Sequence, residues 1–581
     1  MMGTKIERVD NIPLILHWLM KMRIAEIIDS IFTPHGNWQG LSYGRLAVIF
    51  LTYIVHSLNH RLSRAESWVV KHKTVLETVT GWTIGDKDAT DDRLGTLVEA
   101  LGEDDRKIRE FQLKNGQNII QAFELKTKIA RYDTSTFSVH HQPESSNKGI
   151  LKNGHSKDRR PDLLQFKQGL GTLDPAGVPI FTETVAGNDA DDNLYVPAWC
   201  RMVANIGHKD FMFIADCKAA SMETRGFLSN EVGFYLFPLP MTGKTPELLK
   251  NYVLNPPIEP EKIVLGPKAA DEMKEDAENR AVGEGFAVER QMETILPDGK
   301  LHKWEERWLV CQSYAHEKRK IKGFKKCLAK AEKKLKKLKV KKDESVSDFQ
   351  KRAEQILKTH KVSDFIVLKI KESIKRKRKY IGRGRPGPNR SYKMGKVRTV
   401  TLSFKHDDTA IEKFKTLAGW RIYVSNIPEE TMSLTQSARY YREEYVVEHG
   451  FHRLKKGCLP VLPLFLRIDE RIRGLMLILT IALQALTLLE FAARRQLAKN
   501  NETLSGLVPG NPKMKTHRPT AERLLPAFDN LHMIIEEGRT QTKGYLLESL
   551  NGLQRKILDL LGIPLESYNL TFDQPKLKNS S

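Results

Sequence analysis

The stretch Phe211-Met-Phe-Ile-Ala, followed by Asp216, constrains the fold of this chain more than any other. Five apolar residues in succession indicate a strand that is buried on both faces, as in a parallel sheet. Asp216 would then stand at the carboxyl-terminal edge of the strand, where the ligand-binding groups of α/β sheets collect. A single aspartate in such a place is more often a turn residue or a helix cap, so Asp216 alone does not define a site.

A second β-rich run carries Asp133 within or at the end of a predicted strand. The predicted order along this part of the chain is strand, hairpin, helix, strand, helix and strand. The first strand is expected at residues 128–139, the hairpin at 163–185, the first helix at 194–206, and the last two strands at 211–216 and 232–239. This order is that of a ribonuclease H-like fold. The expected class is therefore α/β, with a mixed five-stranded sheet flanked by helices and interrupted by a long insertion.

Residues 440–455 predict one helix with a polar flank beside an apolar flank. Three polar residues recur every seven positions and so fall on one stripe: Tyr441, Glu448 and Lys455. The neighbouring apolar stripe consists of Val447, Phe451 and Leu454. A carboxylate can hold a divalent metal, and an ammonium two turns away can hold the phosphate on which the metal acts. The alternative is a surface helix with an ordinary charged face.

The polar stripe resembles the Tyr-x2-Arg-x3-Glu-x6-Lys signature of bacterial insertion-sequence transposases, the "insertion sequence four" group of DDE enzymes. Tyr441, Glu448 and Lys455 match the signature in register, whereas its arginine position holds Glu444 and the nearest arginine is Arg442. The segments around Asp133 and Asp216 are similar to the two aspartate motifs of the same group, as is the loop at residues 154–162. The resemblance extends over most of the chain.

The resemblance implies an enzyme that cleaves DNA at the ends of an insertion sequence and joins the freed 3′ ends to target DNA. Asp133, Asp216 and Glu448 would be the catalytic residues and would hold two Mg2+ or Mn2+ ions about 4 Å apart, because hard cations prefer carboxylate oxygens. The residues expected to contact DNA phosphates are Tyr441, Arg442 and Lys455. Since two DNA ends must be joined, we expect a homodimer on double-stranded DNA, in the nucleoid of a prokaryotic cytoplasm.

A net charge of +23 indicates a polyanionic partner, nucleic acid first and an anionic membrane second. Residues 318–342 hold 14 Lys or Arg among 25 residues, with the single acid Glu332, on an apolar repeat typical of a short coiled coil. Residues 371–390 are basic again and end in a Gly/Pro/Arg loop at 382–388. We expect a basic helical arm that lies along DNA; the alternative is a solvated helical hairpin.

At 581 residues the chain is expected to contain several domains. The predicted segments are a helical N-terminal domain, the first part of the catalytic core, the basic insertion, the second part of the core with the Glu448 helix, and a helical tail: 1–125, 126–240, 241–400, 401–500 and 501–581. The first could bind DNA ends or serve as a scaffold. Within the tail, the last helix is expected near 545–561.

Five scattered cysteines predict neither a zinc site nor a disulfide framework, and no signal-peptide pattern is found, which fits a cytoplasmic protein. The apolar run 475–489 is too short for a membrane span and predicts a buried core helix. Two other functions stay open: a catalytically inactive DNA-binding protein derived from a transposase, and a metal-dependent nuclease on the same fold. The presence of all three carboxylates favours the enzyme, and Glu444 counts against full activity.

Overall fold

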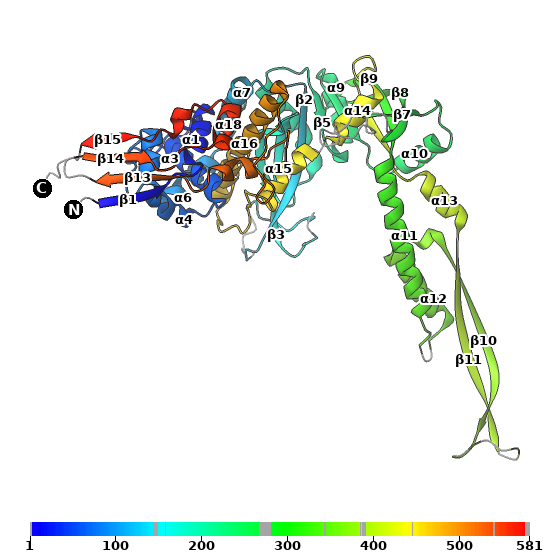
Figure 1. The fold of residues 1–581 in the computed structure, drawn as a ribbon. Coiled ribbons are helices and arrows are strands. Elements are labelled where there is room, and N and C mark those ends of the chain that lie inside the picture. The colour runs from blue at the N-terminus through cyan, green and yellow to red at the C-terminus, as the bar shows by residue number, and fades with distance from the viewer. Residues whose placement is uncertain are drawn as a thin grey trace.

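The computed structural model describes residues 3–142, 149–156, 159–265, 281–341, 344–383, 385, 388, 391–443, 445–537 and 541–575. Glu444, the polar end of the chain from 576 onward, and parts of the loops predicted at 154–162 and 382–388 lie outside these residues. Figure 1 shows an elongated body from which one arm projects, with both chain ends at the opposite extremity.

A nine-stranded mixed sheet in the order β4-β3-β2-β5-β6-β12-β9-β8-β7 crosses the body. In chain order its strands are β2 (Ile129–Val139), β3 (Leu164–Leu173), β4 (Val178–Ala186), β5 (Met212–Ile214), β6 (Phe234–Pro238), β7 (Glu261–Ile263), β8 (Gly283–Ile295), β9 (Leu301–Ser313) and β12 (Trp420–Ser425). β2 pairs antiparallel with β3 and parallel with β5, which in turn pairs parallel with β6. The predicted hairpin and the two parallel strands beside it are therefore present.

The prediction of five strands was wrong in extent. β6 would leave an open edge, and β12 pairs with that edge antiparallel before β9, β8 and β7 continue the sheet. An open edge exposes unpaired backbone groups, which the additional strands satisfy. The segment predicted as a separate insertion thus begins by extending the central sheet.

One long helix, α16 (Asp469–Asn500), lies at the centre of the core and contacts β4 as well as the N-terminal helices. By length and composition it is the one described helix that could cross a membrane, but almost all of its apolar window is buried inside the protein. The prediction of a buried core helix over 475–489 is confirmed.

Seven helices precede the central sheet: α1 (Ile12–Lys21), α2 (Ile24–Asp29), α3 (Tyr43–Ser57), α4 (Leu62–Lys71), α5 (Lys73–Thr80), α6 (Asp91–Glu103) and α7 (Asp105–Ala122). α6 crosses α16 in direct backbone contact, because a Cβ at Gly102 or Gly474 would come within 1.9 Å of a carbonyl oxygen of the other helix. These helices share one continuous hydrophobic core with the sheet and α16. Their packing is therefore continuous with that of the sheet.

The chain ends form a second sheet, in the order β1-β13-β14-β15. Its strands are β1 (Gly3–Arg8), β13 (His532–Glu537), β14 (Gln541–Leu546) and β15 (Phe572–Pro575). The prediction of a helical tail was wrong here, since Tyr545 lies in β14 and the last helix, α18, spans only Gly552–Leu561. β13 is held by pairing with β1 from the other end of the chain, and local sequence periodicity does not report such a contact.

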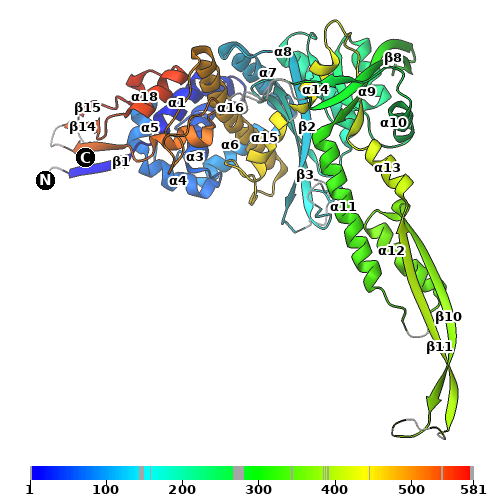
Figure 2. The same ribbon diagram turned by 45° about the vertical axis from the view of Figure 1, so that its right-hand side comes forward.

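The projecting arm consists of α11 (Tyr314–Lys337), α12 (Val346–Thr359) and a hairpin of β10 (Ile366–Tyr380) with β11 (Tyr392–His406) (Figures 1 and 2). The apolar seam predicted on α11 is confirmed, because Phe324, Ala331 and Leu335 are buried in one cluster with residues of α12. The prediction of a helical arm was incomplete, because residues 371–380 belong to a β-strand.

Acid is expected to destabilise the protein through two histidines, His56 in α3 and His60 just after it. Burial, and next the charges of His72 and Arg61 respectively, lower the pKa of each histidine from 6.5 to about 4. Because each pKa is lower in the folded protein than in the unfolded chain, the neutral histidines contribute their full stabilisation above pH 6.5. This contribution to the unfolding free energy is lost as the pH drops from 6.5 toward 4. The expected loss at pH 5 is about 2 kcal/mol for each histidine.

Urea unfolding at pH 7.5 and pH 5 measures this loss. Replacing both histidines (His56→Gln with His60→Gln) is expected to flatten the pH dependence, whereas His35→Gln, on an exposed histidine, leaves it unchanged. An equally steep pH dependence in the double variant would assign the acid lability to other groups.

Candidate active site

Asp133 lies on β2, and Asp216 lies two residues beyond the end of the neighbouring parallel strand β5. β2 and β5 are in register at Arg131 and Ile214, and two further residues along each chain lead to Asp133 and Asp216. Neighbouring strands lie about 4.8 Å apart, so the backbones at Asp133 and Asp216 follow the same end of the β2–β5 pairing. Asp216 keeps an extended backbone and caps the short helix that follows, accepting a hydrogen bond of 3.0 Å from the Lys218 amide.

A tyrosine binds Asp216 and also experiences the charge of Asp133. Tyr195, the first residue of α8 (Tyr195–Ile206), donates its hydroxyl hydrogen bond to Oδ1 of Asp216. Burial, and then the negative charges of Asp216, Asp191 and Asp133, raise the pKa of Tyr195 far above its ordinary value. Tyr195 therefore stays a neutral donor beside a concentration of carboxylates.

Asp191 is a third carboxylate that acts on Tyr195, and it forms an ion pair with each of two lysines. It is buried and accepts hydrogen bonds from Lys167 at 2.7 Å and Lys218 at 2.6 Å. Burial alone would raise the pKa of Asp191, but the two lysines outweigh it and hold that pKa below its ordinary value. The hydrogen bond to Asp191 raises the pKa of Lys218, so a lasting positive charge lies two residues from Asp216.

The single helix predicted over 440–455 is divided into α14 (Leu434–Arg442) and α15 (Tyr445–Lys455). The predicted common stripe of Tyr441, Glu448 and Lys455 is therefore wrong for Tyr441, which lies on α14. Tyr441 packs against Tyr423 of β12, with ring centroids 4.6 Å apart. Arg442 is exposed at the last turn of α14.

The second helix, α15, runs alongside β2 in the same direction. Three contacts set its course: Val446 against Gly177, Gly450 against Leu170, and Lys455 over the ring of Phe137 at 5.4 Å. Leu170 is the cross-strand partner of Asp133. Glu448 precedes Gly450 by about 3 Å of helix rise and so lies near the level of Asp133, but it is exposed to solvent.

The predicted apolar stripe of α15 is confirmed, because Val447, Phe451 and Leu454 are all buried. Arg453 anchors the same helix from inside. Its guanidinium, almost fully buried, pairs with Glu490 of α16 and donates to Glu522 at 2.8 Å. Burial opposes the charge of Arg453, but these two carboxylates raise its pKa above the ordinary value. The helix that carries Glu448 is thus firmly fixed on its inner side.

Arg131 links the strand of Asp133 to the start of this helical region. Its Nε and Nη2 atoms donate to the buried carboxylate of Asp174 at 2.6–2.9 Å, and Nη2 also donates to the carbonyl oxygen of Tyr440 at 2.7 Å. Arg131 and Asp133 are two residues apart on one strand, so both side chains face the same side of the sheet. The arginine therefore ties the last turn of α14 to the strand of the first aspartate.

The three carboxylates are suitable ligands for a divalent cation by their chemistry, but as described they do not form a complete site. In the part of the chain that the structure describes, no three His, Cys, Asp or Glu side chains lie close enough to hold one ion. Asp133 and Asp216 supply hard oxygen donors where negative charge already accumulates around Tyr195. Glu448 lies near the level of Asp133 along β2 and is exposed to solvent, and among the described residues it forms no such group of three with the two aspartates.

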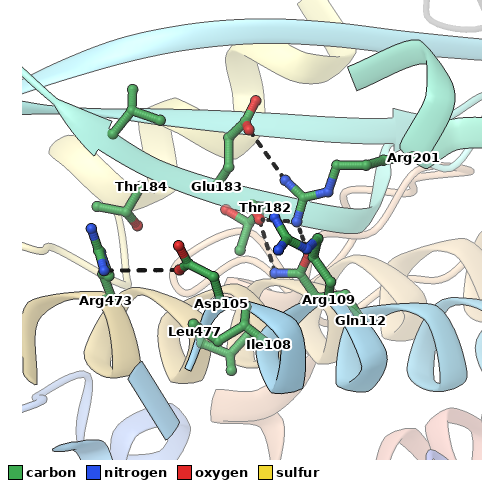
Figure 3. Close-up of a pocket in the computed structure, with 11 residues that line it drawn as sticks. Asp105, Ile108, Arg109, Gln112, Thr182, Glu183, Thr184, Arg201, Arg473 and Leu477 are labelled. Carbon is green, nitrogen blue, oxygen red and sulfur yellow. Dashed lines mark hydrogen bonds and ion pairs between the residues drawn. The ribbon is translucent and has the colours of Figure 1, made fainter. Parts of the chain in front are cut away.

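A cavity of about 230 Å³ lies at the outer edge of the sheet, between α7, β4, α8 and α16 (Figure 3). Four of its charged residues form two ion pairs, Arg201 with Glu183 at 3.2 Å and Arg473 with Asp105 at 3.8 Å, and Arg109 also lines the cavity. Glu183 also accepts a hydrogen bond from Tyr132, the residue before Asp133. The cavity is thus a polar seam that braces the edge of the sheet, and neither predicted aspartate lines it.

Five residues near the aspartates were not predicted from the sequence: Arg131, Asp174, Asp191, Tyr195 and Lys218. Lys218 could have been noted from its place two residues after Asp216. For the others no local signal exists, because each reaches the site through a contact distant in sequence.

The transposase DDE domain family model matches residues 126–484. The matched segment includes Asp133, Asp216 and Glu448, and spans more than half of the chain. A comparison with curated proteins gives no match.

Proposed function

The chain belongs to the family of transposases with a DDE domain, and on that premise we propose that it cleaves DNA at the ends of an insertion sequence and joins them to target DNA. The observation that supports the proposal is the register of β2 and β5, because two residues beyond their last pair lead to Asp133 and Asp216, inside the matched segment. We further propose a ribonuclease H-like core, supported by the strand order β4-β3-β2-β5-β6 with its antiparallel hairpin and parallel neighbours.

Asp133 and Asp216 would hold the metal, with Glu448 as the third candidate ligand. Mg2+ or Mn2+, two ions in the full site, would activate the attacking water or 3′-hydroxyl and stabilise the leaving oxyanion. Tyr195 orients the Asp216 carboxylate by its hydrogen bond, and the Lys218 amide fixes the same oxygen. Lys455, Arg442 and Tyr441 are the proposed phosphate contacts, and Lys455 is the best supported because it lies on the helix beside β2.

We propose that the protein belongs to the "insertion sequence four" group, with its Tyr-Arg-Glu-Lys signature spread over α14 and α15, in a prokaryotic nucleoid. The departure at Glu444 is the main difference from that signature. A homodimer on DNA follows from the reaction, because two ends must be joined. Sedimentation of the protein with end-containing duplex tests it: two protomers per paired complex are expected, and one would refute the dimer.

One observation favours a second candidate function, an inactive DNA-binding protein derived from a transposase. Glu448 is exposed, and among the described residues it does not form a three-ligand group with the two aspartates. Incubation of the purified protein with a labelled duplex that carries its element's end, in Mg2+, in Mn2+ and in chelator, decides between the two. Metal-dependent nicking at the end supports the transposase. Binding without nicking in either metal supports the inactive form.

Replacing Tyr195 by Phe is expected to slow end cleavage by about 10- to 100-fold, as is usual when an outer-shell partner of a metal ligand is lost. The reason is that Asp216 loses the donor that fixes its orientation. Single-turnover cleavage as a function of Mg2+ concentration measures the loss, together with a higher Mg2+ requirement. Tyr314→Phe is the matched control, because it removes a hydroxyl that donates to Glu284 at 3.0 Å, outside the site. Equal rates for both variants would remove Tyr195 from the site.

A further inference from the structure

The β10–β11 hairpin is a long, regular ribbon with two chemically different faces. The strands pair without interruption from Ile366 opposite His406 to Tyr380 opposite Tyr392. Fifteen residues per strand extend over about 50 Å, and the ribbon projects away from the body in both views (Figures 1 and 2). Because side chains alternate along a strand, the even-numbered residues form one face and the odd-numbered residues the other.

The even-numbered face is largely engaged within the protein. Near its base, Ile366, Leu368, Leu402 and Phe404 pack in the cluster of α11 and α12. Farther out, Arg398 pairs with Glu372 across the ribbon and donates to the carbonyl oxygen of Glu344. This face also carries Arg376, Arg378 and Lys396 near the tip, with Arg378 4.6 Å from the ring of Tyr392.

The odd-numbered face, here called the lysine face, is exposed along its length. It carries seven lysines: Lys369, Lys371, Lys375, Lys377, Lys379, Lys393 and Lys405. Its other residues are Ser, Thr, Val and Gly, with no Asp, Glu, Asn, Gln or Arg. Within the described residues none of the seven lysines forms an ion pair. On the opposite face, by contrast, Arg398 pairs with Glu372 and His406 contacts Glu332.

Seven like charges on one exposed face repel one another unless a polyanion neutralises them. Successive residues on this face are about 6.8 Å apart, which equals two phosphate steps of 3.4 Å along one DNA strand. Lysine binds phosphate as a point charge, and the planar side chains that form bidentate pairs with bases are absent from this face. We propose that the lysine face lies along the phosphate backbone of duplex DNA and binds it without reading sequence; this rests on the proposed function.

The experiment compares two full-length variants that each lose three charges from the same outer part of the ribbon. One removes Lys375, Lys377 and Lys379 from the lysine face, and the other removes Arg376, Arg378 and Lys396 from the opposite face, all by replacement with Gln. Binding of a random duplex of about 30 base pairs, twice the ~15 that 50 Å of ribbon can follow, is measured by anisotropy over a salt series without metal. Matching thermal melts show that both variants are folded.

The lysine-face variant is expected to bind on the order of 100-fold more weakly at 0.1 M salt, with a salt slope lower by up to about 2.7. The opposite-face variant should lose less than about fivefold. Equal losses, or a greater loss on the opposite face, would overturn the proposal. A change in self-association without DNA, seen only in the lysine-face variant, would instead assign the lysines to guarding the ribbon against pairing with a second copy.

This test does not depend on catalysis. If the wild type binds the random duplex with the predicted contrast but never nicks an end, the arm proposal stands and the transposase proposal fails. If the wild type nicks an end while both variants bind the random duplex equally well, the transposase proposal stands and the proposal for the lysine face fails.

Discussion

Replacing Asp216 by Asn is expected to reduce cleavage of end-containing DNA by at least about 100-fold, while DNA binding stays within about twofold. The amide keeps the size of the side chain and can still accept from Tyr195 and from the Lys218 amide. It loses the negative charge that a hard cation requires. Removal of outer-shell partners alone costs up to about 100-fold, so loss of a ligand should cost no less. Asp133→Asn should behave in the same way.

Single-turnover nicking of a labelled duplex, with anisotropy on the same DNA, measures both quantities. Asp210→Asn is the matched control: Asp210 lies just before β5, is exposed and pairs only with Lys128 among the described residues. It should cut at the wild-type rate. An Asp216→Asn protein that cuts within about threefold of wild type would show that this carboxylate is not a metal ligand.

Replacing Arg131 by Met is expected to lower both stability and cleavage. Asp174 would be left buried without its partner, which typically costs about 3–5 kcal/mol of unfolding free energy. The carbonyl oxygen of Tyr440 would also lose its side-chain donor, so the link between the Asp133 strand and α14 is broken. Urea unfolding and single-turnover cleavage measure the two effects separately.

The double variant Arg131→Met with Asp174→Leu separates the two roles of Arg131. Apolar replacement of both members of a buried pair is often neutral for stability, so the unfolding free energy should largely recover. Cleavage should remain low, because the contact to Tyr440 is still missing. Recovery of both properties would mean that Arg131 is needed only for folding and does not position the helices beside Asp133.

The parts of the fold that were predictable are those with a strong local pattern. The apolar run before Asp216 indicated β5, and the spacing of Val447, Phe451 and Leu454 indicated the inner side of α15. The β10–β11 ribbon was not predicted because its outer part lacks the alternation of apolar and polar residues that marks a strand. β1 and β13 depend on pairing between the two chain ends.

The candidate site was predictable only in its aspartates and in the helix that carries Glu448. The sequence between α14 and α15 contains no glycine or proline that would predict the end of a helix. What marks it is tertiary: Arg131 binds the Tyr440 carbonyl, and Tyr441 packs on β12 instead of joining the polar stripe. Tyr195 could not have been found either, because its contact with Asp216 depends on how α8 packs against the sheet.

The central claim is that this protein cuts and joins DNA with Asp133 and Asp216. The most direct measurement supplies Mg2+, a labelled duplex with the element's end already exposed as a 3′-hydroxyl, and a supercoiled plasmid, and follows transfer of the label to the plasmid. We expect a covalently joined, nicked or linear product that disappears with Asp216→Asn. Plasmid nicking without transfer of label would indicate a nuclease, and binding with neither reaction would contradict the assignment of catalysis.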